Sequence, residues 1–165
     1  MRPIWYTDGA CSNNGSSNAT GGFGVVCIDE DTGAILYQYQ EFHNENVTNN
    51  RMEMMAIIHA IKKAYEDKPK FIPTIISDSA YAVNSFYNWI YAWERNGWTK
   101  ANGEKLENLD LIKEYYDLVE NQGYCISLQK IKGHAGNYGN ELCDKLATGK
   151  IILDNQKNLD KFEKM

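Results

Sequence analysis

The chain has 165 residues, of which 43% are hydrophobic and 24% charged, and its formal net charge at pH 7 is −5. This length and ordinary globular composition predict a single domain with a sizeable core, and no apolar run is long enough to span a membrane. Because the first residues show no signal-peptide pattern, we expect a cytoplasmic protein; the negative charge argues against a general nucleic-acid binder, so a polyanionic substrate would need local binding groups.

The first part of the chain has the pattern of strands joined by turns. Residues 3–8 predict a strand, which is followed by a loop rich in glycine and asparagine that extends to Gly22. Residues 23–28 and 34–42 predict a second and a third strand. The turn at residues 29–33 joins these two strands into a hairpin.

A helix is predicted from Asn49 to about Asp67, with Thr48 or Asn49 as its cap. Its helical spacing places Glu53 at the head of the face that should enter the core. That face comprises Ala56, Ile57, Ala60, Ile61 and Ala64. Because an unpaired buried carboxylate is costly, Glu53 then needs a cation, a metal or strong donors. Taken alone, however, it is an ordinary acid in the first turns of a helix, where it complements the helix dipole.

The rest of the chain alternates strands with helices. A β-branched run at residues 71–77 predicts a strand, although Pro73 within it argues against a central position in a sheet. A helical segment in two pieces is predicted at 79–96 and a loop at 97–105. A helix follows at 106–121, with Leu109, Ile112, Tyr116 and Val119 on one side. The last predicted elements are a strand at 124–132, a turn at 133–136 and a final helix with Gly149 as a candidate breaker.

This order of elements predicts an α/β fold with a five-stranded mixed sheet, part antiparallel hairpin and part parallel strands, flanked by helices. In such sheets the functional crevice lies beyond the carboxyl ends of the parallel strands, where the strand order switches. We expect residues 1–149 to form the domain and residues 150–165 to form a charged tail that is partly helical. The four cysteines are far apart and form no C-x-x-C pair, so we expect reduced thiols in or near the core.

Four carboxylates fall at the ends of predicted elements. Asp8 ends the first strand, Asp78 follows the strand at 71–77, and Asp144 lies in the first turns of the last helix. Singly, each is an ordinary turn or helix-start residue. Together with Glu53, they would form an oxygen-rich site of the kind that Mg²⁺ prefers, and two such ions about 3.5–4 Å apart suit in-line phosphoryl transfer. No His/Cys cluster indicates zinc, and no G-x-x-x-x-G-K-[ST] loop indicates a nucleotide triphosphatase.

Several short motifs occur in order along nearly the whole chain. They are Tyr6-Thr7-Asp8-Gly9-Ala10, Thr48-Asn49-Asn50-Arg51-Met52-Glu53, Ser77-Asp78-Ser79 with Tyr81, and Lys132-Gly133-His134-Ala135-Gly136 leading to Asn140-Glu141-Leu142-Cys143-Asp144. In this order they resemble type 1 ribonuclease H. The resemblance implies a ribonuclease H-like fold and an endoribonuclease that hydrolyses the RNA strand of RNA–DNA hybrids with two Mg²⁺ ions, for which Mn²⁺ can substitute. The expected products carry 5′-phosphate and 3′-hydroxyl ends.

The resemblance also implies roles for single residues. The implied metal ligands are Asp8, Glu53, Asp78 and Asp144, and the implied mobile helper in proton transfer or product release is His134. The implied contacts to the minor groove of the RNA strand are Asn14, Asn49 and Asn50. The implied contacts to the DNA strand are the aromatic residues Tyr81 and Trp89 and the phosphate-pocket residues Thr48 and Asn108.

Residues 86–100 resemble the substrate handle of that family, which is usually rich in lysine. Here the handle holds only Arg95 and Lys100, opposed by Glu94. Because phosphate neutralisation dominates non-specific affinity, we expect weaker binding than in more basic relatives. The tryptophans Trp93 and Trp98 are expected to pack the handle against the body of the protein.

Two alternatives belong to other functional classes. A non-catalytic module that binds hybrids could share the fold, but the complete set of acids argues against it. The chain could also be the nuclease domain of a reverse-transcriptase-like protein, but no polymerase or integrase segment is present. We expect a monomer that needs neither a protein partner nor a membrane.

Overall fold

A mixed β-sheet forms the centre of the structure, a computed structural model in which residues 1–131, 137–154 and 157–158 are described. The strands are β1 (Pro3–Ser12), β2 (Thr20–Asp29), β3 (Ile35–His43), β4 (Thr74–Ser77), β5 (Ser127–Lys130) and β6 (Lys157–Asn158), in the order β5-β4-β1-β2-β3-β6. The pairs β1–β2 and β2–β3 are antiparallel, and the pairs β1–β4, β4–β5 and β3–β6 are parallel. The predicted five-stranded mixed sheet is confirmed, and the two-residue β6 extends it at β3.

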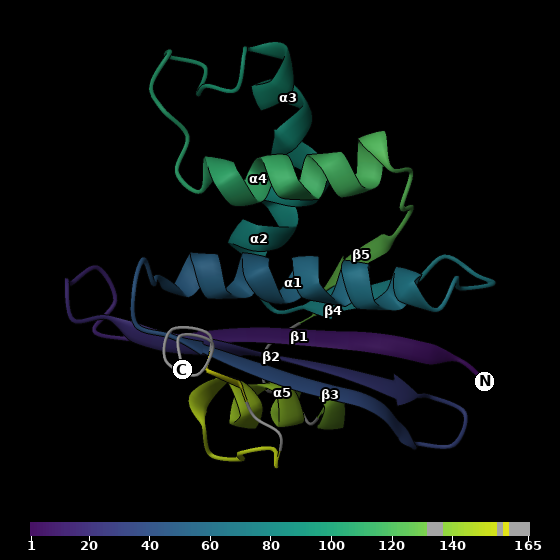
Figure 1. Cartoon of the computed structure of the whole chain (residues 1–165). Coiled ribbons are helices and arrows are strands. Elements are labelled where there is room, and N and C mark those ends of the chain that lie inside the picture. Colours follow the sequence, from purple (N-terminus) through teal and green to yellow (C-terminus); the bar gives the residue numbers. More distant parts are fainter. Residues whose placement is uncertain (132–136, 155–156, 159–165) are drawn as a thin grey trace.

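Helices cover both faces of this sheet. They are α1 (Asn49–Glu66), α2 (Ala80–Asn84), α3 (Ile90–Arg95), α4 (Leu109–Tyr116) and α5 (Tyr138–Thr148), with the π-helical turns η1 (Ser85–Trp89) and η2 (Asp117–Asn121). Helix α1 lies on one face with α2, α3 and α4 stacked beyond it, and α5 covers the other face (Figure 1). In the described ranges, no helix is long and apolar enough to cross a membrane.

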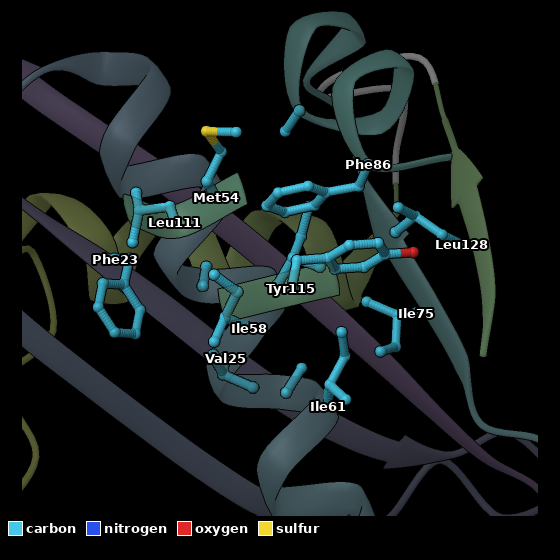
Figure 2. Packing of buried hydrophobic residues seen from close by; sticks show 14 of the residues in the cluster. Phe23, Val25, Met54, Ile58, Ile61, Ile75, Phe86, Leu111, Tyr115 and Leu128 are labelled. Atoms are coloured by element: carbon cyan, nitrogen blue, oxygen red, sulfur yellow. The ribbon is translucent and has the colours of Figure 1, made fainter. Parts of the chain in front are cut away.

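The main core fills the space between α1, the sheet and the outer helices. The predicted inner face of α1 is buried throughout, as is Glu53 at its head. Beyond α1, the rings of Phe86 and Tyr115 stack with centroids 4.2 Å apart, and Figure 2 shows them close to Ile75 of β4. A smaller cluster that includes Tyr6 and Leu146 packs between the sheet and α5. The sheet is therefore anchored on both faces, which fixes the ends of its strands.

The first strand is longer than predicted, and the glycine-rich loop is shorter. β1 continues to Ser12 and β2 begins at Thr20, so that only residues 13–19 form the loop. Of the glycines in the predicted loop, Gly9, Gly21 and Gly22 lie inside the strands and Gly15 remains in the loop. Helix α5 packs directly on the backbone of β2. A Cβ at Gly22 would lie 2.9 Å from the carbonyl oxygen of Ala147, and a Cβ at Gly24 would lie 2.6 Å from that of Cys143.

The helix predicted at 106–121 begins only at Leu109 and continues as a π-helical turn from Asp117. The predicted apolar side packs against the core, but the most buried face is rotated away from it around the helix axis. The buried residues are Leu111, Ile112, Tyr115 and Leu118, whereas Leu109, Tyr116 and Val119 are only partly buried. Because the apolar residues form one broad arc opposite the charged residues, periodicity alone could not choose which part of that arc is most buried.

Three smaller predictions also need correction. β4 is a central strand despite Pro73, because the proline precedes the strand and its carbonyl oxygen accepts the amide of Ser127. The strand predicted at 124–132 is limited to β5. Cys27 and Cys143 are buried thiols as expected, but Cys125 is exposed.

Candidate metal centre

The parallel pairing of β1 with β4 ends inside the sheet and leaves an opening in the ladder beyond it. The last paired residues are Tyr6 and Ile76, and the side chain of Thr7 closes the ladder by donating to the carbonyl oxygen of Ile76 at 2.9 Å. Asp8 is thus in the middle of β1, not at its end as predicted, but it lies just past the end of the β4 ladder. Asp78 directly follows β4. Both acids therefore reach the same opening.

Gly9 brings the third acid to this opening. A Cβ at position 9 would lie 2.4 Å from the amide nitrogen of Glu53 and 2.6 Å from the carbonyl carbon of Met52, so only glycine lets β1 and α1 approach so closely. The amide of Gly9 donates to Oδ1 of Asp8 at 3.0 Å and also to Oε1 of Glu53. One backbone N–H therefore holds two carboxylates side by side.

Asp8, Glu53 and Asp78 form a compact cluster. Each offers a carboxylate oxygen, and these atoms all lie within 4.8 Å of one another. Asp8 is 5% exposed and Glu53 is 8% exposed. Burial, followed by the charge of Asp78, raises the pKa of Asp8 to about 7. Burial and the charges of Asp8 and Asp78 likewise hold the pKa of Glu53 well above its usual value.

This donor set fits a divalent cation that prefers oxygen ligands. Within residues 1–131, 137–154 and 157–158, no cationic side chain forms an ion pair with any of the three acids. Three clustered carboxylates of this kind must either retain protons or bind a positive ion. The geometry therefore supports the predicted oxygen-ligand metal site.

The fourth predicted ligand stands apart from this cluster. Asp144 lies on α5, is only partly buried, and does not belong to the group of three acids within 4.8 Å. It is still close enough for its charge to contribute to the raised pKa of Asp8. The hydroxyl of Thr148 donates to the carbonyl oxygen of Asp144 at 2.8 Å, one turn along the helix. His134, the predicted helper, lies outside the described residues.

The predicted substrate residues gather around the start of α1. Oδ1 of Asn14 accepts the amide of Asn49 at 3.1 Å, which ties the loop at 13–19 to the helix. The side chain of Thr48, one of the two predicted caps, caps α1 by accepting the amide of Arg51 at 3.0 Å. Nδ2 of Asn108 donates to the hydroxyl of Tyr81 at 3.1 Å.

The two remaining predicted substrate residues are Asn50, also at the start of α1, and Trp89, which lies on η1. Asn50 follows Asn49 in the first turn of α1 and is partly buried. Trp89 is exposed on η1, where its ring centroid lies 6.0 Å from that of Trp93. The handle that carries it is attached as expected, because Trp93 and Trp98 both pack against the main core. Trp98 also makes an edge-on contact with Tyr116, with centroids 5.1 Å apart.

Sequence reasoning missed two contributors to this region. The first is the amide of Gly9, for which the available signal was a glycine directly after a strand acid in a motif that the resemblance included. The second is Arg51, whose guanidinium donates to both carboxylate oxygens of Asp110. Its partner is distant in the sequence, and no local pattern points to it.

Comparisons with known proteins agree with this geometry. The sequence model of the family described as RNase H matches residues 2–152 of the chain. A curated protein named Ribonuclease H from Thermoanaerobacter sp. (strain X514) is 37% identical over 154 residues, which cover 93% of this chain and 92% of that protein. Another Ribonuclease H, from Jannaschia sp. (strain CCS1), is 40% identical over 146 residues, 87% of each chain.

Solved structures with the same arrangement include the solution structure of the PFV RNase H domain, with a TM-score of 0.74 and 25% identity over 88% of this chain and 92% of that one. The crystal structure of LC9-RNase H1, described as a type 1 RNase H with the type 2 active-site motif, has a TM-score of 0.74 and 27% identity over 93% and 75% of the two chains. LC11-RNase H1 in complex with RNA/DNA hybrid, with a TM-score of 0.62 and 21% identity over 88% and 94%, shares the fold.

Proposed function

Because this chain belongs to the ribonuclease H family and is a ribonuclease H enzyme, we propose that it cuts the RNA strand of RNA–DNA hybrids at the cluster of Asp8, Glu53 and Asp78. The observation that carries this proposal is the convergence of three carboxylates, two of them buried, at the end of the β1–β4 ladder. The family is metal-dependent, and this cluster can bind a metal ion.

The metal requirement that we propose is two Mg²⁺ ions, held by these three acids and by Asp144 at the rim. Bound ions of this kind polarise phosphate oxygens and lower the pKa of a bound water. The protein contributes the positions of the ligands. Gly9 fixes one oxygen each of Asp8 and Glu53, while α5 presents Asp144 from the opposite face of the sheet. Asp8 would hold the ions together with Glu53 and Asp78, whose carboxylate oxygens lie within 4.8 Å of its own.

The proposed substrate is an RNA–DNA hybrid, the ligand named for the structurally similar LC11-RNase H1 complex. Amide side chains that both donate and accept hydrogen bonds suit the reading of a 2′-hydroxyl, and we assign this role to Asn14, Asn49 and Asn50. We assign contacts with the DNA strand to Tyr81, Trp89, Thr48 and Asn108. His134 is proposed to help proton transfer or product release.

The first experimental test is substrate choice. Labelled RNA–DNA hybrid, double-stranded RNA and double-stranded DNA are incubated with the protein in Mg²⁺ or in EDTA. We expect cleavage of the RNA in the hybrid alone, in Mg²⁺ alone, with 5′-phosphate and 3′-hydroxyl ends. Equal cutting of double-stranded DNA, or undiminished activity in EDTA, would contradict the proposal. Binding of hybrid without cleavage under every metal condition would favour a non-catalytic module.

The handle provides a second test, because its positive charge is low. Glu94 is partly buried on α3, next to the exposed Arg95. We expect Glu94→Lys to tighten hybrid binding and to steepen its dependence on salt by about one unit of log–log slope, since each added phosphate contact releases about one counterion. The measurement is hybrid affinity across a salt series, with Asp67→Lys at the exposed carboxyl end of α1 as a charge-matched control. Unchanged affinity and slope for Glu94→Lys would show that the handle does not contact substrate.

A further inference from the structure

Arg51 connects three of the side chains that we assign to the DNA strand. Its backbone amide donates to Oγ1 of Thr48 at 3.0 Å, and its Nη1 donates to Oδ1 of Asn108 at 3.3 Å. Asn108 in turn donates from Nδ2 to the hydroxyl of Tyr81 at 3.1 Å. One residue thus joins the start of α1 to the start of α4 and, through Asn108, to α2.

The guanidinium of Arg51 is itself not placed to meet a ligand. Nη1 and Nη2 donate to the two carboxylate oxygens of Asp110 at 2.9 and 2.8 Å. The side chain is 12% exposed, and Nε is buried without an acceptor among the described residues. Hydrogen bonds from Arg51 hold the pKa of Asp110 below its usual value, so Asp110 stays ionised. The two parallel hydrogen bonds from Nη1 and Nη2 of Arg51 to Asp110, which we call the fork, therefore stay formed. The charge of Arg51 is therefore satisfied inside the protein.

The hydrogen bonds around Arg51 occupy acceptor atoms of Thr48, Asn108 and Tyr81 and leave donor groups of the same side chains without an acceptor. Oγ1 of Thr48, Oδ1 of Asn108 and the hydroxyl oxygen of Tyr81 each accept one bond. In the described part of the chain, no acceptor is found for the Thr48 or Tyr81 hydroxyl proton, and the second hydrogen on Nδ2 of Asn108 has none either. Three donors without acceptors suit the oxygens of an anion. The N-terminus of α1, which Thr48 caps, adds a favourable potential for negative charge.

Asn108 depends on this support more than an ordinary loop residue would. Its backbone is left-handed, with φ 60°, a conformation that is uncommon for residues other than glycine and is tolerated best by Asn and Asp. Its side chain is held at both ends, the oxygen by Arg51 and the nitrogen by Tyr81. Without the guanidinium of Arg51, the side-chain amide of Asn108 could rotate, and the second hydrogen on its Nδ2 would no longer point in a fixed direction.

We propose that Arg51 is a positioning residue, braced by Asp110, whose guanidinium orients Asn108 and, through it, Tyr81, so that both donate, together with the neighbouring Thr48 hydroxyl, to a single phosphate of the uncut strand. This inference rests on the proposed function, because it takes the ligand to be a hybrid. It assigns to Arg51 no contact with substrate. The distinction matters because a direct contact and a positioning role make opposite predictions when the charge of Asp110 is removed.

The test scans single neutral methylphosphonates along the DNA strand of a short hybrid. In the unaltered protein, the substitution at one position should raise the half-saturating hybrid concentration in single-turnover cleavage by about tenfold, since a hydrogen-bonded charge is lost. In Arg51→Met and in Arg51→Lys, which cannot form the fork, this position-specific effect should shrink to about twofold or less. The cleavage rate at saturation should change much less than the half-saturating concentration.

A second ion pair between the same helices serves as the control. Lys62 of α1 pairs with Glu114 of α4, away from Asn108. If Arg51 only anchors α4, Lys62→Met should weaken the methylphosphonate effect as well; we expect it to leave the effect intact. Melting curves identify any variant that fails to fold, and Arg51→Lys and Asp110→Asn then carry the test in place of Arg51→Met.

Asp110→Asn decides between the two roles of Arg51. If Arg51 has a positioning role, Asp110→Asn should reduce the position-specific effect of the methylphosphonate, because the pairing that holds the guanidinium of Arg51 is weakened. A direct contact between Arg51 and phosphate predicts a larger effect, because a competing negative charge is gone, and this result would overturn the inference. A full effect in Arg51→Met would also overturn it. Failure of the unaltered protein to cleave any hybrid would instead refute the proposed function.

Discussion

Replacement of Asp8 by Asn should abolish cleavage of the hybrid and yet leave a more stable protein. The substitution keeps the size of the side chain but removes a charge that two dications would need. It also removes repulsion, because Asp8 lies within a few ångströms of Glu53 and Asp78 in a buried cluster. We expect a gain of about 1–2 kcal/mol in the free energy of unfolding without divalent ions, or about 2–8 °C in Tm.

The stability gain should depend on pH in a defined direction. Because the folded protein raises the pKa of Asp8 from 3.8 to about 7, the folded state binds a proton that the unfolded state has lost over this interval. The unaltered protein therefore loses stability from this group as the pH rises from about 4 to about 7, whereas Asn does not titrate. The advantage of Asp8→Asn should be small near pH 4 and largest above pH 7.

The measurements are single-turnover cleavage at matched Mg²⁺ and melting curves from pH 4 to pH 8. Mg²⁺ should raise the Tm of the unaltered protein and should raise that of Asp8→Asn much less, since a ligand that binds only the folded state stabilises it. Asp67→Asn, the same change at an exposed acid at the carboxyl end of α1, is a matched control. Near-normal cleavage by Asp8→Asn would overturn the assignment of the metal site.

Replacement of Gly9 by Ala should cost both stability and activity. The added Cβ would lie within 3 Å of backbone atoms of Met52 and Glu53, which cannot move without displacing the first turns of α1. We expect a loss of about 2–3 kcal/mol in the free energy of unfolding. Because Glu53 moves with that helix, we also expect about 100-fold slower cleavage in the fraction that remains folded.

Gly15 offers a control that separates close packing from backbone strain. It has φ 85° in the loop at 13–19, and a Cβ there would have no neighbour within 4 Å. Gly15→Ala should therefore cost only about 1 kcal/mol of left-handed backbone strain and should leave cleavage close to normal. Chemical denaturation and single-turnover rates for both variants provide the comparison. Equal losses in the two variants would refute the role of the close β1–α1 contact.

The elements that carry the site could be predicted because they depend on local signals. The cap at Thr48 and the buried face that follows Glu53 came from helical spacing, and the structure has both. Asp8 and Asp78 could be placed at one opening because parallel strands bring their carboxyl ends together. The extent of β1 could not be predicted, since glycines inside a strand have the same pattern as a loop when the helix that packs on them is unknown.

Other features depend on contacts between distant residues. The fork between Arg51 and Asp110 joins positions 59 apart, and nothing near either residue identifies its partner. The most buried part of α4 could not be chosen from the sequence because its apolar residues form one broad arc, and the packing of Tyr115 against Phe86 decides which part of that arc faces the core. Pro73 misled in the same way, because its effect depended on whether β4 began before or after it.

The short strand β6 has a consequence for the behaviour of the protein in concentrated solution. Without β6, β3 would be an edge strand of the sheet. The unpaired N–H and C=O groups of an edge strand can pair with strands of other molecules and start aggregation. β6 pairs with Glu41 and Phe42, at the carboxyl end of β3. The amino end of β3, with exposed Ile35 and Leu36, lies beyond that pairing. Growth of intermolecular sheets would therefore begin at the amino end, far from the acids, and a polar or proline substitution there is the natural route to a more soluble enzyme.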